Sequence, residues 1–159
     1  MFKETMYLRF YGFFRIPLLF VVRPSVLEID DKHSVVKIPL NYWTKNHLGS
    51  MYFGTLAIGA DLGGGLIATH LIKKSGKKIM LVFKDFKADF LKRPESDVHF
   101  SCNDGEEIQK VINETIKTGK RVNTPMKITA TCPKLFGKEP VAQFVLTLSL
   151  KAEQSLRGA

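Results

Sequence analysis

The stretch that decides the fold is residues 46–72, NHLGSMYFGTLAIGADLGGGLIATHLI. Asp61 is its only formally charged residue, and six glycines leave little side-chain bulk around it. A helix over residues 50–66 would present apolar or small residues on every face, which is typical of a helix buried in a protein core or in a membrane. Because a lone carboxylate is costly to remove from water, we expect Asp61 to have a chemical use.

A membrane-spanning helix is the alternative interpretation of this stretch. Its length suits a bilayer, but a central Asp adds roughly 3 kcal/mol to the cost of insertion. Asn46, Ser50 and Thr55 weaken the alternative further. Each mid-helix glycine costs up to about 1 kcal/mol relative to alanine, a cost that is tolerated where other groups must approach the backbone closely. The sequence therefore favours a tightly wrapped core helix.

The composition indicates one ordinary globular domain. The chain has 159 residues, 45% hydrophobic and 25% charged, with a net charge of +9. This charge favours acidic partners such as nucleotide phosphates or an anionic membrane. The lysines and arginines are spread along the chain, which favours solubility as their main role, and we expect no nucleic-acid partner. Cys102 and Cys132 have no zinc-type spacing, so we expect buried free thiols and a cytoplasmic location.

Residues 1–24 predict a lead-in segment before the main domain. An amphipathic helix is expected over residues 4–14, followed by a turn. The apolar run over residues 10–22 is broken by Arg15 and Pro17, so it lacks the continuous apolar core of a signal peptide. Attachment to a membrane surface is the alternative role of this segment.

Alternating apolar residues predict six strands, and one further helix follows the fourth of them. In the longest strand, the even positions from Met80 to Phe90, apart from Lys84, are expected to share one face. Asp104 and Glu107 have the spacing of a capping box, and Gly119 is expected to end the helix. The expected strands are residues 26–30, 34–41, 79–91, 98–102, 126–132 and 142–150.

This order predicts an α+β fold in which a curved antiparallel sheet wraps around the central apolar helix. We expect one domain over residues 25–152 and a frayed tail over residues 153–159. Residues 73–77, KKSGK, are expected to form a turn after the central helix.

The segment resembles the hotdog fold, in the branch of acyl-CoA thioesterases related to phenylacetic-acid degradation. The family motif is N-x-x-G-x-x-H-G-G, then six residues, then Asp or Glu. Asn46, Gly49, Gly54 and Asp61 match it, and the phrase DFKADFLKRPESDVHFSC resembles the family's third and fourth strands. The closest fit is a sub-branch with an N-x-x-G-(S/T)-M-Y-F-G style of motif.

The resemblance implies hydrolysis of an acyl-CoA thioester without a bound metal or a cofactor other than the coenzyme A of the substrate. Asp61 would be the general base or nucleophile, and the backbone N–H of Phe53 or Gly54 would donate to the oxyanion. Asn46 would orient water or the carbonyl. A homodimer or a dimer of dimers is implied, since the carboxylate often comes from the other subunit. Expected substrate contacts are Tyr52, Gly49, Lys92 and Arg93.

Two departures from the motif keep a second function open. Tyr52 and Phe53 stand where the family has its His and first Gly, so a non-catalytic acyl-CoA or fatty-acyl binding module is the alternative. The site residues have structural alternatives too. Asp61 could pair with His47 or His70, Asn46 could cap the central helix through its loop, and Ser50 could be the helix N-cap.

Overall fold

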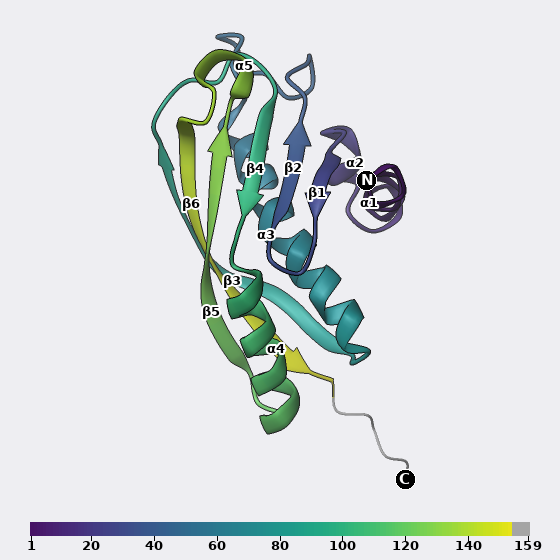
Figure 1. Ribbon diagram of the computed structural model, residues 1–159. Coiled ribbons are helices and arrows are strands. Elements are labelled where there is room, and N and C mark those ends of the chain that lie inside the picture. The colour runs from purple at the N-terminus through teal and green to yellow at the C-terminus, as the bar shows by residue number, and fades with distance from the viewer. Residues whose placement is uncertain (154–159) are drawn as a thin grey trace.

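The computed structural model describes residues 1–153, and its centre is one antiparallel sheet curved around helix α3 (Figure 1). The strand order is β1-β2-β4-β5-β6-β3. The predicted α+β architecture is therefore confirmed. The strands are β1 (Ser25–Ile29), β2 (Ser34–Ile38), β3 (Ile79–Phe90), β4 (Val98–Cys102), β5 (Val122–Thr131) and β6 (Pro140–Ala152). The helices are α1 (Phe2–Arg15), α2 (Pro17–Val21), α3 (Phe53–Ser75), α4 (Gly105–Thr118) and α5 (Pro133–Phe136).

Helix α3 is the core helix that the sequence favours. It is long and apolar enough to cross a membrane, but more than half of its most apolar window is buried inside the protein. Two of its glycines lie directly against the sheet: a methyl group on Gly59 would collide with the buried Phe100 ring, and one on Gly64 would collide with Met126. The missing side chains let the helix backbone approach the sheet, which is the physical reason for the glycine content.

The ends of α3 differ from the prediction. The helix begins at Phe53 rather than at residue 50, and Ser50 is not its N-cap. The turn expected over residues 73–77 is shorter than predicted, because the helix continues through Ser75 and the chain turns only at Gly76 and Lys77. It ends at Gly76, whose φ of 66° is left-handed and suits glycine. Lys73 and Lys74 thus lie in the last turn, where cations interact favourably with the helix dipole.

Strand β3 contains a bulge that the alternation rule does not anticipate. The register against β6 shifts between Phe83 and Phe86, where Asp85 accepts a hydrogen bond from the Thr147 N–H. The prediction that the even positions share one face is therefore wrong for the first half of the strand. Leu81 and Phe83 pack against the core there, while the even residues turn inward only after the bulge.

Two further expectations are corrected at the edges of the domain. Asp104 precedes α4, but its carboxylate accepts the Lys127 N–H at 2.6 Å and makes no capping bond, so the predicted capping box is wrong. The lead-in segment forms two helices rather than a helix and a turn. The predicted helix over residues 4–14 is part of α1, in which Leu8 is the one large apolar side chain that is buried.

The remaining predictions near the core are confirmed. Cys102 and Cys132 are buried free thiols, and burial raises the pKa of Cys102 to about 11. Helix α4 buries an apolar stripe and ends at Gly119. The predicted tail over residues 153–159 lies outside the described residues, apart from Glu153.

Gly59→Ala should reduce the free energy of unfolding by about 1–3 kcal/mol, because the new methyl group must displace the fully buried Phe100 ring. Gly65→Ala is the matched control on the same helix. There a methyl group would meet the Phe83 ring at 3.8 Å, an ordinary contact, so alanine should be neutral or stabilising by up to about 1 kcal/mol. Urea unfolding of both variants tests this, and equal effects would contradict close packing at Gly59.

Candidate functional site

The loop that leads into α3, residues 41–52, is organised by Asn46. Its side-chain oxygen accepts hydrogen bonds from the N–H of Leu48 at 2.9 Å, the N–H of Ser50 at 3.2 Å and the Ser50 hydroxyl at 3.3 Å. Gly49 has a left-handed φ of 82°, which favours glycine. The structure therefore gives both motif residues a role in shaping the loop. The predicted alternative that Asn46 caps the central helix is wrong, because its side chain bonds only within the loop and α3 has no side-chain cap.

The first turn of α3 presents backbone donors without acceptors. Tyr52 is the N-cap, and its own N–H bonds to the Thr44 carbonyl at 2.9 Å. The next three N–H groups, of Phe53, Gly54 and Thr55, have no helical acceptor and no other backbone or side-chain partner among residues 1–153. Together with the helix dipole, they form an electropositive point suited to a developing oxyanion.

Aromatic side chains crowd this helix end. The Tyr52 ring fills the space where a side chain at position 54 would stand, which explains the glycine there. The rings of Tyr52 and Phe53 are 4.8 Å apart, and Phe53 lies 6.4 Å from Phe90 of β3. About half or more of the Tyr52 and Phe53 side chains is exposed, so a ligand can reach this end of α3 beside them.

A hollow of about 550 Å³ lies at this helix end, and it gathers most of the predicted site residues. Lys92 and Arg93 line it but are already paired: Lys92 with Glu139, and Arg93 with Glu95 at 2.6 Å. Both pairs are at the surface, where ion pairs are weak, so an anionic ligand could compete for these cations. The lining residues are Asn46, His47, Ser50, Met51, Tyr52, Phe53, Leu56, Phe90, Leu91, Lys92, Arg93 and Pro94.

Asp61 lies further along α3, half-buried and unpaired. Its carboxylate makes no hydrogen bond and no ion pair within residues 1–153. Burial raises the pKa of Asp61, because desolvation penalises the charged form. The predicted alternative of a histidine partner is wrong, since His70 contacts Asp31 at 3.3 Å and His47 lines the hollow at the helix end. The described residues contain no cluster of three His, Cys, Asp or Glu side chains suited to a metal.

A second cavity, of about 540 Å³, contains Asp61 in its wall. Tyr7 and Tyr11 of α1, Leu66 of α3 and Phe83 of β3 also line it. At its far end the Lys73 ammonium lies 3.7 Å from the centre of the Tyr7 ring. The prediction of a lead-in segment over residues 1–24 did not include this contribution to the cavity. The four-residue spacing of Tyr7 and Tyr11, which places them on one helix face, was the available signal.

The Asp61 carboxylate and the unpaired N–H groups at the N-terminus of α3 are separated along the helix. Asp61 is eight residues after Phe53, which corresponds to about 12 Å along the helix axis. A single thioester carbonyl must lie within hydrogen-bond distance of the oxyanion donors and close to the catalytic carboxylate. The Asp61 and the helix end of one subunit therefore do not act together on one carbonyl.

The sequence matches one known protein family over most of its length. The family described as a domain of unknown function, DUF4442, matches residues 6–139. The chain belongs to the DUF4442 family. No curated protein sequence gives a significant match to this DUF4442 member.

Solved structures confirm the predicted hotdog fold of this DUF4442 protein. A Pseudomonas aeruginosa protein described as a probable thioesterase has a TM-score of 0.75 and 20% identity, over 94% of this chain and 96% of that one. A Chlorobaculum tepidum protein of unknown function has a TM-score of 0.81 and 11% identity, over 94% of both chains. A Haemophilus influenzae thioesterase has a TM-score of 0.66 and 14% identity, over 89% and 87%. These identities establish the fold alone, and the phenylacetic-acid-degradation branch stays a prediction.

Asp61→Asn should raise the free energy of unfolding at pH 7. The folded-state pKa of Asp61 lies above its unfolded value, so wild-type stability falls as the pH rises from about 4 through the folded pKa. Asn does not titrate, so the advantage of the variant should grow over this window and be absent below it. Urea unfolding between pH 4 and pH 8 measures the difference.

Asp30→Asn is the matched control with the opposite sign. The N–H groups of His33 and Lys32 lower the pKa of the exposed Asp30, so this variant should be less stable than the wild type at pH 7. Its deficit should fade as the pH falls through the folded pKa of Asp30. A loss of stability at neutral pH in Asp61→Asn would contradict an unpaired carboxylate at position 61.

Proposed function

We propose that this protein is an acyl-CoA thioesterase that works as a homodimer. The proposal rests on two features of α3. Asp61 is a half-buried carboxylate without a partner among residues 1–153, and within those residues the N–H groups at the N-terminus of the same helix are unpaired. The hotdog fold and the thioesterase descriptions of two structural neighbours support the same reaction class.

In the proposed reaction, water attacks the thioester carbonyl while Asp61 accepts its proton. The carbonyl oxygen becomes an oxyanion, stabilised by the N–H of Phe53 or Gly54. Collapse of this intermediate breaks the carbon–sulfur bond and releases the carboxylic acid, and the proton passes to the coenzyme A thiolate. Because burial raises the pKa of Asp61, its carboxylate is a stronger base than an exposed one. Direct attack by Asp61, followed by hydrolysis of the resulting anhydride, is the nucleophilic variant.

The separation of Asp61 from its own helix end supports a site shared between two subunits. Strand β3 is an edge strand that pairs with β6 alone, and such an edge favours pairing with a second copy. The face of α3 that carries Asp61 also carries the half-exposed small residues Ala57 and Gly65. We infer that two-fold pairing of β3 brings two α3 helices together, so that Asp61 of one subunit reaches the helix end of the other.

The coenzyme A moiety is proposed to occupy the hollow at the α3 N-terminus. Lys92 and Arg93 would bind its phosphates in exchange for their surface partners. The apolar cavity beside Asp61, lined by Leu66, Tyr11 and Phe83, suits the acyl group.

The binding module remains the second candidate because of one observation. The Tyr52 ring lies against Gly54, at the point where the oxyanion would approach. If this ring stays in place when substrate binds, the fold would hold an acyl-CoA without turning it over.

Asp61→Ala should lower thiol release from acyl-CoA by about 10²–10⁴-fold, the usual contribution of a general base. A panel of short, long and aromatic acyl-CoAs, followed by thiol detection, measures it. Glu106→Ala, at an exposed carboxylate of α4, is the control and should retain activity. No release from any substrate, with acyl-CoA still protecting the protein against heat, would favour the binding module. No release and no protection would overturn both functions.

Phe53→Pro tests the oxyanion donor with little change in the helix. Proline is favoured at the first helical position, and the extended φ and ψ of Tyr52, −64° and 138°, suit a residue before proline. The substitution removes one N–H, and if this group is the donor, kcat should fall by about 10²–10³-fold. An unchanged kcat would leave the Gly54 N–H as the donor.

Mixed dimers test the shared site. A dimer of Phe53→Pro and Asp61→Ala subunits has one intact site if each site combines the two subunits, and none if each site lies within one subunit. Refolding the two inactive variants together in equal amounts should therefore restore about a quarter of wild-type activity, since half of the dimers are mixed and each has one of two sites. No recovery, with dimers confirmed by sedimentation, would contradict the shared site.

A further inference from the structure

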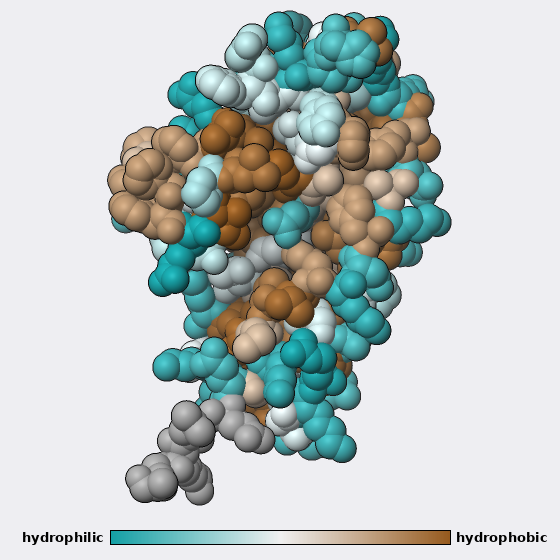
Figure 2. All heavy atoms as spheres, turned by 180° about the vertical axis from the view of Figure 1, so that it is seen from behind, coloured by the Kyte–Doolittle hydropathy of each residue, from teal (hydrophilic) through white to brown (hydrophobic). Residues whose placement is uncertain are grey.

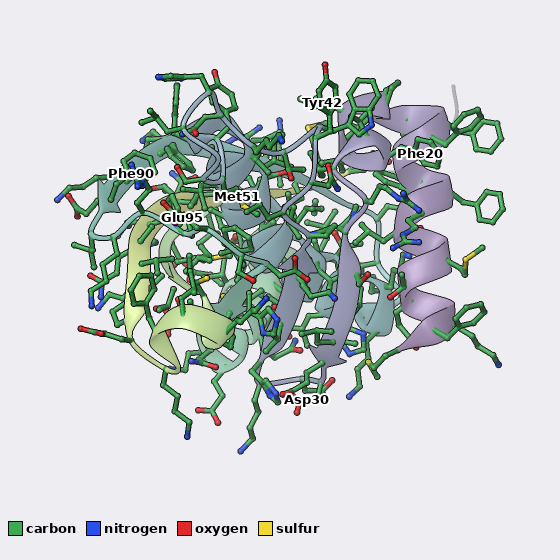
Figure 3. The ribbon with its side chains drawn as sticks, turned by 90° about the horizontal axis from the view of Figure 1, so that it is seen from above. Phe20, Asp30, Tyr42, Met51, Phe90 and Glu95 are labelled. Atoms are coloured by element: carbon green, nitrogen blue, oxygen red, sulfur yellow. The ribbon has the colours of Figure 1, made fainter. Side chains whose placement is uncertain are left out.

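The N-terminal helices expose an unusual amount of apolar surface. Among residues 1–153, twelve of the 23 large hydrophobic side chains that are exposed lie in the first 21 residues, and Trp43 lies beside them. Figure 2 shows hydrophobic side chains gathered over this side of the molecule. In Figure 3, Phe20 marks these helices on the side of the sheet opposite Phe90. This surface is therefore separate from the Phe90 end of β3, while the inner side of α1 shares the Asp61 cavity with the first half of that strand.

Four residues form what we call the outer face of α1: Phe2, Met6, Phe10 and Phe13. Their spacings of four, four and three residues place them on one side of a helix. Each is exposed, Phe2 by 79%. Burying side chains of this size is strongly favourable, so an exposed row of them indicates an interaction surface.

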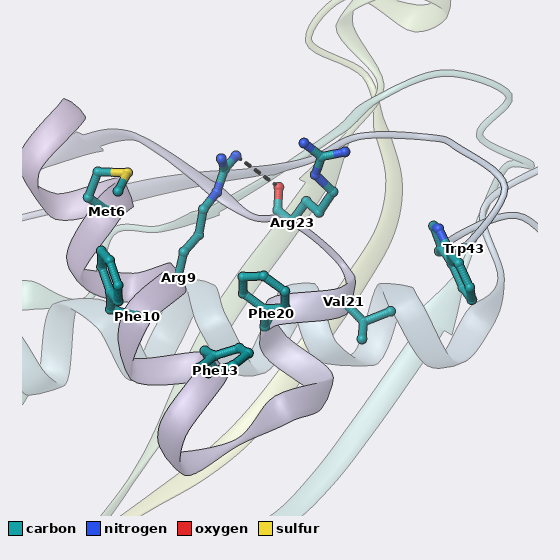
Figure 4. Close-up of a pocket in the computed structure, with 8 residues that line it drawn as sticks. All are labelled: Met6, Arg9, Phe10, Phe13, Phe20, Val21, Arg23 and Trp43. Atoms are coloured by element: carbon teal, nitrogen blue, oxygen red, sulfur yellow. Dashed lines mark hydrogen bonds between the residues drawn. The ribbon is translucent and has the colours of Figure 1, made fainter.

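The outer face borders a hollow of about 730 Å³, which has two arginines in its wall (Figure 4). The Arg9 guanidinium is held by the Pro24 carbonyl at 3.0 Å, by the Ser25 hydroxyl at 3.2 Å and by the Arg23 carbonyl at 3.5 Å. Arg23 has a left-handed φ of 51°, which is uncommon for a residue with a side chain. Arg9 therefore fixes the turn after α2 and places two cations beside the aromatic side chains.

The charge of residues 1–24 indicates which kind of partner covers the outer face of α1. Residues 1–24 contain four basic residues, Lys3, Arg9, Arg15 and Arg23, against one acid, Glu4. Glu4 pairs with the N-terminal ammonium at 2.8 Å. A second copy related by two-fold symmetry would bring the same cations face to face, and like charges across an interface are unfavourable. An anionic surface complements them.

We propose that α1 and α2 dock on an anionic lipid bilayer. Aromatic side chains on one face with basic residues among them are the composition of helices that lie in a membrane interface. Phe2 and Phe10 insert between lipids, and Lys3 and the exposed Arg23, which lines the hollow beside the outer face, bind the headgroup phosphates. The opposite side of the same helix carries Tyr7 and Tyr11, which line the Asp61 cavity. Docking thus leaves α1 between the bilayer and the Asp61 cavity, and it does not depend on the proposed thioesterase activity.

Co-sedimentation with vesicles tests the proposal. Vesicles of phosphatidylcholine with 30% phosphatidylserine should bind the full-length protein, and vesicles of phosphatidylcholine alone should bind it much less. Phe2→Ser with Phe10→Ser, two exposed positions in no aromatic pair, should weaken binding to the anionic vesicles by about tenfold or more. Lys3→Glu with Arg23→Glu should do so to at least the same extent, because each basic residue near the surface contributes about fivefold.

Matched variants on and beside α5 test whether vesicle binding depends on the outer face of α1 or only on the net positive charge of the protein. Leu135→Ser removes an exposed apolar side chain of α5, and Lys134→Glu with Lys138→Glu changes the net charge by the same amount as the N-terminal pair. Both should bind like the wild type. Circular dichroism and thermal unfolding confirm that each variant is folded.

Three results would overturn the proposal. The first is an absence of binding to anionic vesicles at low salt. The second is an equal loss of binding in the Lys134 and Lys138 control, which would mean attraction by net charge alone. The third is an oligomer that dissociates in Phe2→Ser with Phe10→Ser while the wild type ignores vesicles, which would mean that this face binds a second copy.

Discussion

The close approach of α3 to the sheet is the constraint on which the rest of the structure depends. Gly59 lies under the Phe100 ring and Gly64 under Met126, so the helix backbone itself forms part of the core packing. An interior at this density has no room for an added carbon without displacement. The curvature of the sheet around α3 follows from this contact (Figure 1).

Burying one face of α3 so completely leaves the opposite face available for the proposed reaction. Asp61 lies on that face without a partner among residues 1–153, and within the same residues the first N–H groups of the helix lack acceptors. Both features lower the free energy of unfolding, and the close packing of the α3 glycines against the sheet offsets part of that loss. The same rigid helix then holds the carboxylate and the donors at a fixed spacing, and that spacing is what points to two subunits.

The N-terminal helices lie outside the core formed by the sheet and α3. Tyr7 and Tyr11 on their inner side line the Asp61 cavity, while Phe2 and Phe10 on their outer side are exposed. Arg9 fastens them to the start of β1. A single short helical segment thus faces the candidate site on one side and solvent on the other.

The sequence alone determined the six strands, the buried glycine-rich helix and the singular position of Asp61, because periodicity and lone charges are local properties. The tertiary structure decided three things. The bulge before Phe86 reversed the alternation of β3, since register depends on the partner strand. The Asp104 carboxylate accepts a hydrogen bond from the Lys127 N–H instead of capping its own helix, since a donor distant in the chain competes with the local cap. Tyr7 lines the Asp61 cavity because α1 packs against β1, which brings two segments far apart in the chain together around that cavity.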